Sequence, residues 1–352
     1  MGERPGVGSG DVTPVVLADR PSWIERFDDS PRFEERDGSG PRRRTIRTMR
    51  VRAAVVQAAP IGFDREQTID KLERLIAEAA QGGAQLAVFP EAFVPGYPRG
   101  IDFGTVVGQR TPEGRDQFRR YFDGAIIVPG PDVDRIATAA REHAIHLVVG
   151  VIERDGGTLY DTALFCTPDG YLGKHRKLMP TAAERLIWGF GDGSTLSVYD
   201  TSLGPLGAVI CWENYMPMLR MTMYAKGIQI YCAPTADSRE TWLPTMRHIA
   251  LEGRCFVLTT CQLLRRSDLP MDISNQISEE PDAILLRGGA AIVNPLGAVL
   301  AGPCFDEETI LHAELDLDDI ARGKYDFDVA GHYARPDVFQ LSVNEKPQRP
   351  VT

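Results

Sequence analysis

The sequence predicts a layered α/β fold. From Val51 onward, short apolar segments rich in β-branched residues alternate with longer segments whose apolar residues recur at helical spacing. The predicted strands cluster in the centre of the chain with helices between them, so helices should cover both outer faces of the strand layers. The 352 residues suffice for a sizeable core, and α/β folds of this size often form one domain.

The first half of the predicted domain begins with a strand at residues 51–58. Residues 66–80 have helical spacing, and Gly82-Gly83 ends that helix. An apolar strand at 86–89 follows and is ended by Pro90. The other elements predicted in this half are a helix at 132–143 and strands at 146–152 and 158–166.

The second half is predicted to begin with a strand at 207–210 that runs directly into Cys211. A helix at 216–225 follows and is ended by Gly227, and residues 294–297 have the composition of a hairpin turn. Residues 265–286 show no motif that assigns them a role. The other predicted elements are a helix at 240–252 and strands at 228–233, 256–261, 290–293, 298–301 and 309–315.

Residues 1–49 differ in composition from the rest of the chain. They are rich in Gly, Pro, Asp, Glu and Arg, and contain little that could be buried. This composition predicts a disordered extension, and Met49, directly before the first core strand, is an alternative start of translation. We expect a single domain at 50–341 and a C-terminal tail at 342–352.

Cys211 stands where an apolar strand gives way to a helix-like stretch. A cysteine at the start of a helix lies near the positive end of the helix dipole, which should favour the nucleophilic thiolate. Most free cysteines are instead small buried hydrophobic residues. We prefer that interpretation for the cysteines in or beside other apolar runs, which are Cys166, Cys232, Cys255, Cys261 and Cys304.

Two further segments favour a catalytic role for Cys211. Glu91 stands at the carboxyl end of a buried strand, before a run of Pro, Gly and aromatic residues. An apolar setting should raise the pKa of this carboxylate, as a general base near neutral pH requires, whereas most loop glutamates are simply solvated. Lys177 and Glu184 lie in a basic segment after a hairpin signal at 168–170, although such segments are usually solvated surfaces.

In combination, these segments resemble the nitrilase superfamily of carbon–nitrogen hydrolases, and within it the nitrilase branch. The resemblance runs from about Val51 to about Leu341, and several segments look especially like plant-type nitrilases. The segments that carry it are FPEAFVPGYPRG (89–100), HRKLMPTAAERLIWGFGDGSTL (175–196), AVICWENYMPMLR (208–220), YAKGIQIYCAPTAD (224–237), HIALEGRCFVLTTCQ (248–262) and GHYARPDVF (331–339).

The resemblance implies a role for each matching residue. The family's glutamate base falls on Glu91, its lysine on Lys177, its additional glutamate on Glu184 and its cysteine on Cys211. Trp188, Tyr97 and Tyr215 match positions of the family's substrate pocket. The backbone N–H of Trp212, at the start of the helix-like stretch, is a candidate donor to the oxyanion. The resemblance further implies a four-layer αββα sandwich that pairs across helices into a homodimer, with larger spiral oligomers common in the family.

The expected activity is hydrolysis of an organic nitrile to the carboxylic acid and ammonia through a thioimidate and a thioester on Cys211. An amidase using the same residues is the first alternative, and a non-enzymatic scaffold is the second. Substrates left open are arylaliphatic and aliphatic nitriles, β-cyanoalanine and cyanide. We expect no metal and no organic cofactor, because no zinc motif or dinucleotide loop is present and the chemistry needs only side chains and water.

Composition excludes several other classes of protein. The formal net charge of −10 disfavours nucleic acid as a partner, since phosphate binding needs a basic surface. No apolar stretch approaches the length of a membrane span, and no secretory signal is present. Six cysteines without a tight pairing pattern indicate reduced thiols and a cytoplasmic setting.

Overall fold

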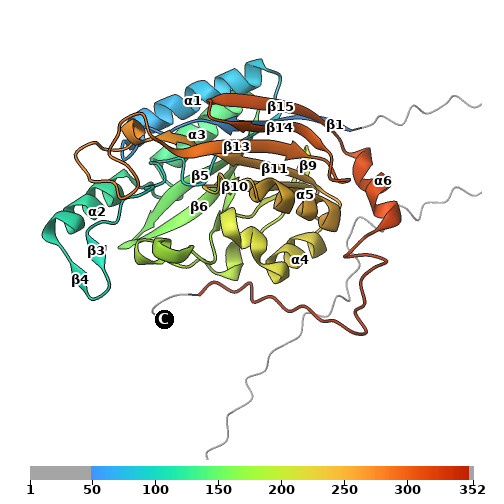
Figure 1. Ribbon diagram of the computed structural model, residues 1–352. Coiled ribbons are helices and arrows are strands. Elements are labelled where there is room, and N and C mark those ends of the chain that lie inside the picture. Colours follow the sequence, from blue (N-terminus) through green and yellow to red (C-terminus); the bar gives the residue numbers. More distant parts are fainter. Residues whose placement is uncertain (1–48, 349–352) are drawn as a thin grey trace, which may run out of the picture.

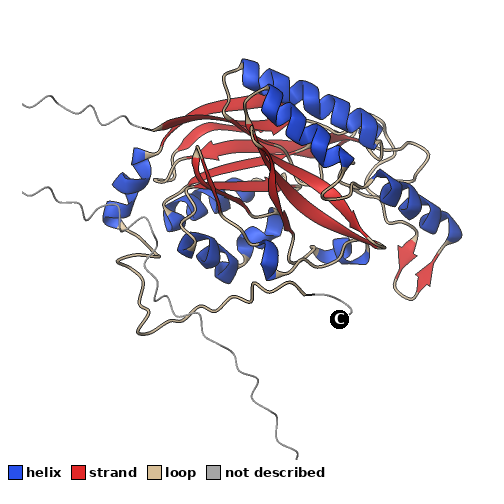
Figure 2. Ribbon diagram, turned by 180° about the vertical axis from the view of Figure 1, so that it is seen from behind, coloured by secondary structure: helices blue, strands red, loops and turns tan. Residues whose placement is uncertain are grey.

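The computed structural model describes residues 49–348 as two β-sheets packed face to face, with helices on both outer faces (Figures 1 and 2). The predictions of a disordered extension and of the end of the C-terminal tail fall on residues 1–48 and 349–352, which lie outside the described residues. In the first sheet, β1 and β5 flank β2 in parallel, and the other neighbours pair antiparallel. Its order is β15 (Thr309–Asp316), β1 (Arg50–Gln57), β2 (Leu86–Val88), β5 (His146–Asp155), β6 (Thr158–Thr167) and β7 (Gly170–Arg176).

The second sheet repeats this arrangement. Its strands β9, β10 and β11 run parallel, and β13 pairs antiparallel with β11, β12 and β14. Its order is β12 (Leu263–Arg265), β13 (Ile284–Val293), β11 (Phe256–Cys261), β10 (Ile230–Thr235), β9 (Gly204–Ala208) and β8 (Tyr199–Thr201), with β14 (Val299–Phe305) on β13.

Alternation along the strands produces four layers. In β1, Ala53 and Val55 face the second sheet, whereas Ala54 and Val56 pack under the helices α1 (Arg65–Gln81) and α3 (Pro131–Glu142). In the same way, β10 buries Ile230 and Cys232 between the sheets. Its Tyr231 and Ala233 pack under α4 (Pro217–Ala225) and α5 (Trp242–Gly253). The layers are therefore helix, sheet, sheet and helix, as the sequence resemblance implied.

Most predicted strands and helices are confirmed within a few residues. Strands β7, β8 and β12 were not predicted, nor were three further elements that bury few apolar side chains. Helix α2 (Pro112–Gly124) is highly charged, and its apolar face is short, since only Phe118, Tyr121 and Phe122 pack on a buried cluster. Helix α6 (Asp318–Asp326) and the hairpin of β3 (Thr105–Val106) with β4 (Gln109–Arg110) also bury very little. The strand predicted at 290–293 is longer, since β13 continues back through the exposed Arg287 and two glycines to Ile284.

The described part of the C-terminal tail lies against the domain. After α6 the chain passes along the α4 side of the molecule (Figure 1). Val329 and Val343 pack on the buried cluster under α4 and α5. Lys226 Nζ lies 2.5 Å from Glu345 Oε1, and the Gln348 N–H donates to Asp192 Oδ2 at 2.7 Å. Residues 342–348 are thus held by an apolar contact at Val343, followed by polar contacts at Glu345 and Gln348.

Gly150 provides a test of how tightly β5 packs against the segment after β2. A Cβ at this position would lie 2.1 Å from the Pro90 carbonyl oxygen and 2.7 Å from Glu91 Cα. We expect Gly150→Ala to lower the free energy of unfolding by about 1–3 kcal/mol, because backbone atoms must move to admit the methyl group. Gly157→Ala is the matched control, since a Cβ there meets nothing within 4 Å. Equal stabilities of the two variants in urea unfolding would contradict this packing.

Candidate active site

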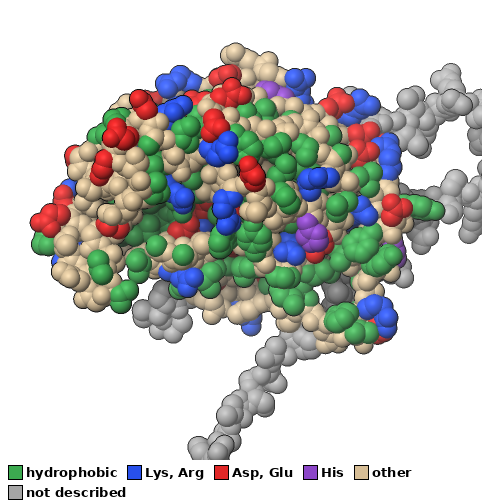
Figure 3. All heavy atoms as spheres, viewed as in Figure 1, with side chains coloured by type: hydrophobic (Ala, Val, Ile, Leu, Met, Phe, Trp, Pro, Cys, Tyr) green, Lys and Arg blue, Asp and Glu red, His purple; other side chains and the backbone are tan. Residues whose placement is uncertain are grey.

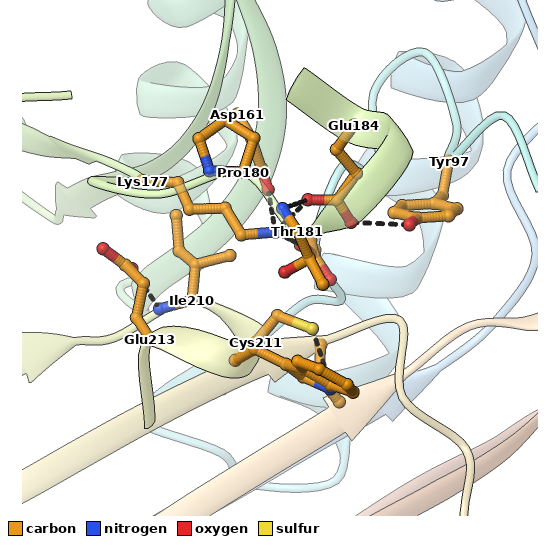
Figure 4. A network of polar contacts seen from close by, with 12 residues as sticks. Tyr97, Asp161, Lys177, Pro180, Thr181, Glu184, Ile210, Cys211 and Glu213 are labelled. Carbon is orange, nitrogen blue, oxygen red and sulfur yellow. Dashed lines mark hydrogen bonds and ion pairs between the residues drawn. The ribbon is translucent and has the colours of Figure 1, made fainter. Parts of the chain in front are cut away.

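The four predicted catalytic residues converge from separate elements: Figure 4 shows Lys177, Glu184 and Cys211, and Glu91 contacts Lys177. Glu91 follows β2, and Lys177 directly follows β7. Glu184 lies in the short 3-10 helix η2 (Ala182–Leu186), and Cys211 begins the 3-10 helix η4 (Cys211–Tyr215), shortly after β9. All four side chains are buried. β2 belongs to the parallel part of the first sheet and β9 to the parallel part of the second. The site therefore joins the two halves of the sandwich.

Lys177 is the centre of this cluster. Its Nζ donates to Glu91 Oε1 at 2.5 Å and to Glu184 Oε2 at 2.8 Å, and lies 3.3 Å from Asp161 Oδ2. Burial disfavours the ammonium, but the neighbouring acids, Glu91 first among them, outweigh it and raise the pKa of Lys177 well above its usual value. Lys177 therefore stays charged at neutral pH.

Glu184 is held from two sides. Its Oε2 accepts from Lys177 and from the Thr181 N–H at 2.6 Å, and its Oε1 accepts from the Tyr97 hydroxyl at 2.6 Å. Burial raises the pKa of Glu184, while the Lys177 charge opposes that rise. Burial and the neighbouring carboxylates raise the pKa of Tyr97 well above its usual value, so its hydroxyl remains a donor. These contacts fix Glu184 beside Lys177.

Cys211 has a constrained backbone. Its φ of 50° lies in the left-handed region, which costs a non-glycine residue about 1–3 kcal/mol. Asn214 Nδ2 donates to the Cys211 carbonyl at 2.7 Å and to the Val209 carbonyl at 2.9 Å, and Tyr231 donates to Asn214 Oδ1 at 2.9 Å. The Thr235 hydroxyl lies 3.1 Å from the Cys211 sulfur. The neighbouring residues thus compensate for the strain and fix the direction of the thiol.

The expectation that a helix dipole favours the Cys211 thiolate is wrong. Burial is the largest influence and raises the pKa of the Cys211 thiol well above its usual value, and the Glu91 charge raises it further. The Lys177 ammonium and the Thr235 hydroxyl oppose this rise without cancelling it. The helix that starts at Cys211 is a single 3-10 segment of five residues, so its dipole is small. The resting thiol is neutral and needs a base.

The four predicted pocket residues form two aromatic pairs. Tyr97 and Trp188 meet edge to face at 5.6 Å, and the Trp188 ring lies 5.6 Å from Lys177 Nζ, so this pair adjoins the buried cluster. Trp212 and Tyr215 meet at 5.7 Å beside Cys211, and both are about 40% exposed. The Trp212 indole donates to Asp237 at 2.9 Å. A role for the Trp212 backbone N–H toward an oxyanion stays a prediction.

Glu213 is a functional residue that the sequence did not identify as one. Its buried carboxylate accepts from the Leu178 N–H at 2.7 Å and from the Ile210 N–H at 2.9 Å, and lies 3.0 Å from His175 Nε2. Leu178 and Ile210 are the neighbours of Lys177 and Cys211 in the chain. One carboxylate therefore ties together the segments that carry the ammonium and the thiol.

Two other polar side chains adjoin Glu91 and Lys177. Gln262, directly after β11, donates its amide to the carbonyl oxygens of Glu91 at 2.8 Å and Ala92 at 3.3 Å. Asp161, in β6, lies beside Lys177. Both were missed because each lies in or next to a strand that reads as buried structure. A polar side chain in such an apolar run is the signal that could have located them.

Residues 265–286, to which the sequence assigned no role, pack against the segment that follows Tyr97. Arg266 is fully buried and donates to the backbone carbonyls of Pro270 at 3.1 Å and Ile273 at 2.7 Å, which folds the loop around it. The Gln276 N–H donates to the Gly100 carbonyl at 2.7 Å, and Asn275 Nδ2 donates to the Arg99 carbonyl at 2.6 Å. The loop is thus fixed against the chain that continues from Tyr97.

The molecular surface is hollowed between α2 and the strands, with hydrophobic and acidic side chains inside and basic side chains at the rim (Figure 3). Between residues 49 and 348, no three His, Cys, Asp or Glu side chains are grouped so that they could hold a metal ion. Over the same range, no helix combines the length and apolarity needed to cross a membrane. All six cysteines are free thiols.

Comparison with known proteins gives a consistent result. The family model for carbon-nitrogen hydrolases matches residues 52–325. An aliphatic nitrilase of Sinorhizobium fredii (strain HH103) is 63% identical over 300 residues, covering 85% of this chain and 97% of the relative. A bifunctional nitrilase/nitrile hydratase of Lupinus angustifolius is 58% identical over 308 residues, covering 86% and 88%.

Among solved structures, a carbon-nitrogen hydrolase from Helicobacter pylori G27 has a TM-score of 0.63 to this chain. It is 22% identical and covers 79% of this chain and 93% of its own. At this identity the likeness shows the fold alone, and it is the same sheet-on-sheet sandwich.

Glu213→Gln tests the tie between the two segments of the site. The amide keeps the shape but has a single acceptor oxygen, so one of the two backbone N–H groups loses its partner. We expect the free energy of unfolding to fall by about 1–3 kcal/mol, measured by urea denaturation. Glu142→Gln, at an exposed position at the end of α3, is the control. If both variants have wild-type stability, Glu213 does not tie the segments together.

Proposed function

The chain belongs to the carbon–nitrogen hydrolase family and is similar over most of its length to nitrilases, and from this premise we propose that it hydrolyses an organic nitrile to the carboxylic acid and ammonia. The observation that supports this proposal best is a neutral, buried thiol close to a carboxylate and an ammonium. A nitrile carbon is a poor electrophile and needs a strong nucleophile, a proton for its nitrogen and stabilisation of developing charge. The cluster supplies all three.

In the first step, Glu91 takes the thiol proton as the Cys211 sulfur bonds to the nitrile carbon. The nitrogen gains that proton, and the product is a thioimidate on the enzyme. Lys177 stabilises the negative charge that develops on nitrogen, in a buried setting where a fixed ammonium is more effective than in water. The backbone N–H of Trp212 is the second donor that we propose.

In the second step, Glu91 removes a proton from a water molecule that adds to the thioimidate carbon. The tetrahedral intermediate then expels its protonated nitrogen as ammonia and leaves a thioester. A second water attacks the thioester carbon, the carbon–sulfur bond breaks, and the acid leaves as the thiol regains its proton. Glu184 orients Lys177 through their 2.8 Å contact. Losing one such stabilising donor typically lowers kcat by about 10²–10³-fold.

Release of amide as a second product follows from the same intermediate. If the carbon–sulfur bond breaks before ammonia leaves, the tetrahedral intermediate gives the amide instead of the thioester. The Lupinus angustifolius relative is named a bifunctional nitrilase/nitrile hydratase, and a nitrile hydratase releases the amide. The position of the proton on the leaving nitrogen decides the partition. The Lys177–Glu184 pair adjoins the cysteine and is the group we assign to that control.

The amidase alternative uses the same residues, and so do the β-cyanoalanine and cyanide alternatives. An amide also accepts thiolate attack and expels ammonia, so geometry alone does not separate amides from nitriles. The 63% identity to an aliphatic nitrilase favours the nitrile. The scaffold alternative is disfavoured because a binding module gains nothing from burying an ammonium among carboxylates, which is costly in free energy.

Cys211→Ala tests the nucleophile. We expect ammonia release from a panel of aliphatic, arylaliphatic and amino-acid nitriles to fall by about 10⁴–10⁶-fold, because the covalent route is lost. Mass spectrometry of the acid-quenched wild-type enzyme should show an added acyl or imidate group on the peptide that contains Cys211. Cys304→Ala is the matched control, because Cys304 is a partly exposed free cysteine in β14.

The matched amides belong in the same assay. Turnover of amides alone would replace the nitrilase proposal by the amidase. Near wild-type ammonia release from Cys211→Ala would reject the covalent scheme for both activities.

A further inference from the structure

Asp161 is a carboxyl group of the cluster that the mechanism above does not use. It lies on β6, is 1% exposed, and its Oδ2 is 3.3 Å from Lys177 Nζ (Figure 4). Its backbone carbonyl accepts from the Lys177 N–H at 2.8 Å, which fixes the strand edge beside the lysine. Neither oxygen of its side chain receives a hydrogen bond, and Glu91 Oε2 receives none either.

The charges of the cluster do not balance if every acid is ionised. Glu91, Glu184 and Asp161 contribute three negative charges around the single Lys177 ammonium, which leaves a net charge of −2. The Cys211 thiol is neutral and adds no compensation. An uncompensated buried charge costs several kcal/mol, and buried acids avoid this cost by keeping a proton. At least one of the three carboxyls is therefore protonated.

The hydrogen bonds identify which acid keeps the proton. Glu184 accepts three donors, from Tyr97, Lys177 and Thr181, so its anion is well stabilised. Glu91 accepts the shortest contact from Lys177. Asp161 has only the longest contact to the ammonium and no hydrogen-bond donor. Burial and then the Glu91 charge raise the pKa of Asp161 well above its usual value.

The remaining unpartnered oxygens have a common explanation. Asp161 and Glu91 both lie against Lys177 Nζ, at 3.3 Å and 2.5 Å, so the two acidic side chains are neighbours. Two carboxylates in contact repel each other and cannot form a hydrogen bond, whereas a carboxylic acid donates to a carboxylate in a strong, charge-assisted bond. A proton between the two groups would give both Asp161 and Glu91 Oε2 the partner that each lacks.

We propose that Asp161 is a positioning residue that remains a neutral acid and donates its proton to Glu91. This bond holds the Glu91 carboxylate in the direction from which it can take the Cys211 proton. A neutral Asp161 also gives the cluster one negative charge fewer than an ionised Asp161 would. The anionic intermediates formed on sulfur and nitrogen therefore meet less repulsion. The inference rests on the proposed function only for its catalytic consequence, because the shared proton belongs to the resting protein.

Two substitutions separate charge from hydrogen bonding. Asp161→Asn has no charge and keeps an N–H donor of nearly the same shape, so we expect kcat to stay within about 10-fold of the wild type. Asp161→Leu keeps the branching of the side chain, is bulkier, and offers no donor. Its kcat should fall by about 10–100-fold with little change in KM, because Glu91 loses the partner of its second oxygen.

Infrared difference spectra of the resting protein test the proton directly. The wild type minus Asp161→Asn spectrum should contain the C=O stretch of a buried carboxylic acid near neutral pH, which a purely structural aspartate would not give. This readout needs no turnover, so it decides the protonation of Asp161 even if the enzyme proves inactive on nitriles and amides. It also decides the point if Asp161→Leu fails to fold in circular dichroism.

Three outcomes would overturn the inference. The first is an absence of the acid band in the difference spectrum. The second is a loss of kcat in Asp161→Asn as large as that in Asp161→Leu, which would mean that the negative charge is required. The third is wild-type kcat in a folded Asp161→Leu, which would mean that Asp161 does not position Glu91.

Discussion

The contact of the buried Lys177 ammonium with the carboxylates of Glu91 and Glu184 is the interaction on which the rest of the site depends. The three groups come from the ends of β2 and β7 and from η2, and none of them could be buried alone without a large desolvation cost. Removing one partner of such a pair typically costs about 3–5 kcal/mol, because the other charge is left buried and uncompensated. The charges therefore assemble together or not at all.

The sandwich makes this arrangement possible by supplying apolar stabilisation on both sides of it. Buried apolar side chains fill the space between the sheets and under the two helical layers. The charged site lies at the end of these layers, where strands of both sheets terminate. Glu213 links the two catalytic segments there through backbone N–H groups, so the positions of thiol and ammonium depend on backbone contacts as well as on side-chain rotamers.

Sequence periodicity was sufficient for a layered α/β fold with helices outside, and the resemblance supplied the four-layer arrangement. The strand at Phe256–Cys261 agrees with its predicted bounds, and β1, β2, α1 and α5 agree within a few residues, because each has a clear apolar pattern. Helices α2 and α6 have only short apolar patterns in highly charged segments, so they were missed. The four residues that the sequence predicted to be catalytic do lie together in the structure; they are Glu91, Lys177, Glu184 and Cys211. Asp161 and Glu213 required coordinates, because their roles depend on which backbone and side-chain atoms face them.

The protonation of Cys211 was the point at which reasoning from sequence gave the wrong sign, and the reason bears on the mechanism. A thiolate paired with a cation is already formed before substrate binds, so its proton is lost to solvent. A buried neutral thiol keeps its proton until a base next to it acts, and burial is what keeps it neutral here. Nitrile attack needs a proton on nitrogen at the moment when sulfur gives one up. A site that stores the proton on sulfur and passes it through Glu91 has the proton available among buried side chains. The same burial that makes the thiol less acidic therefore suits it to this reaction.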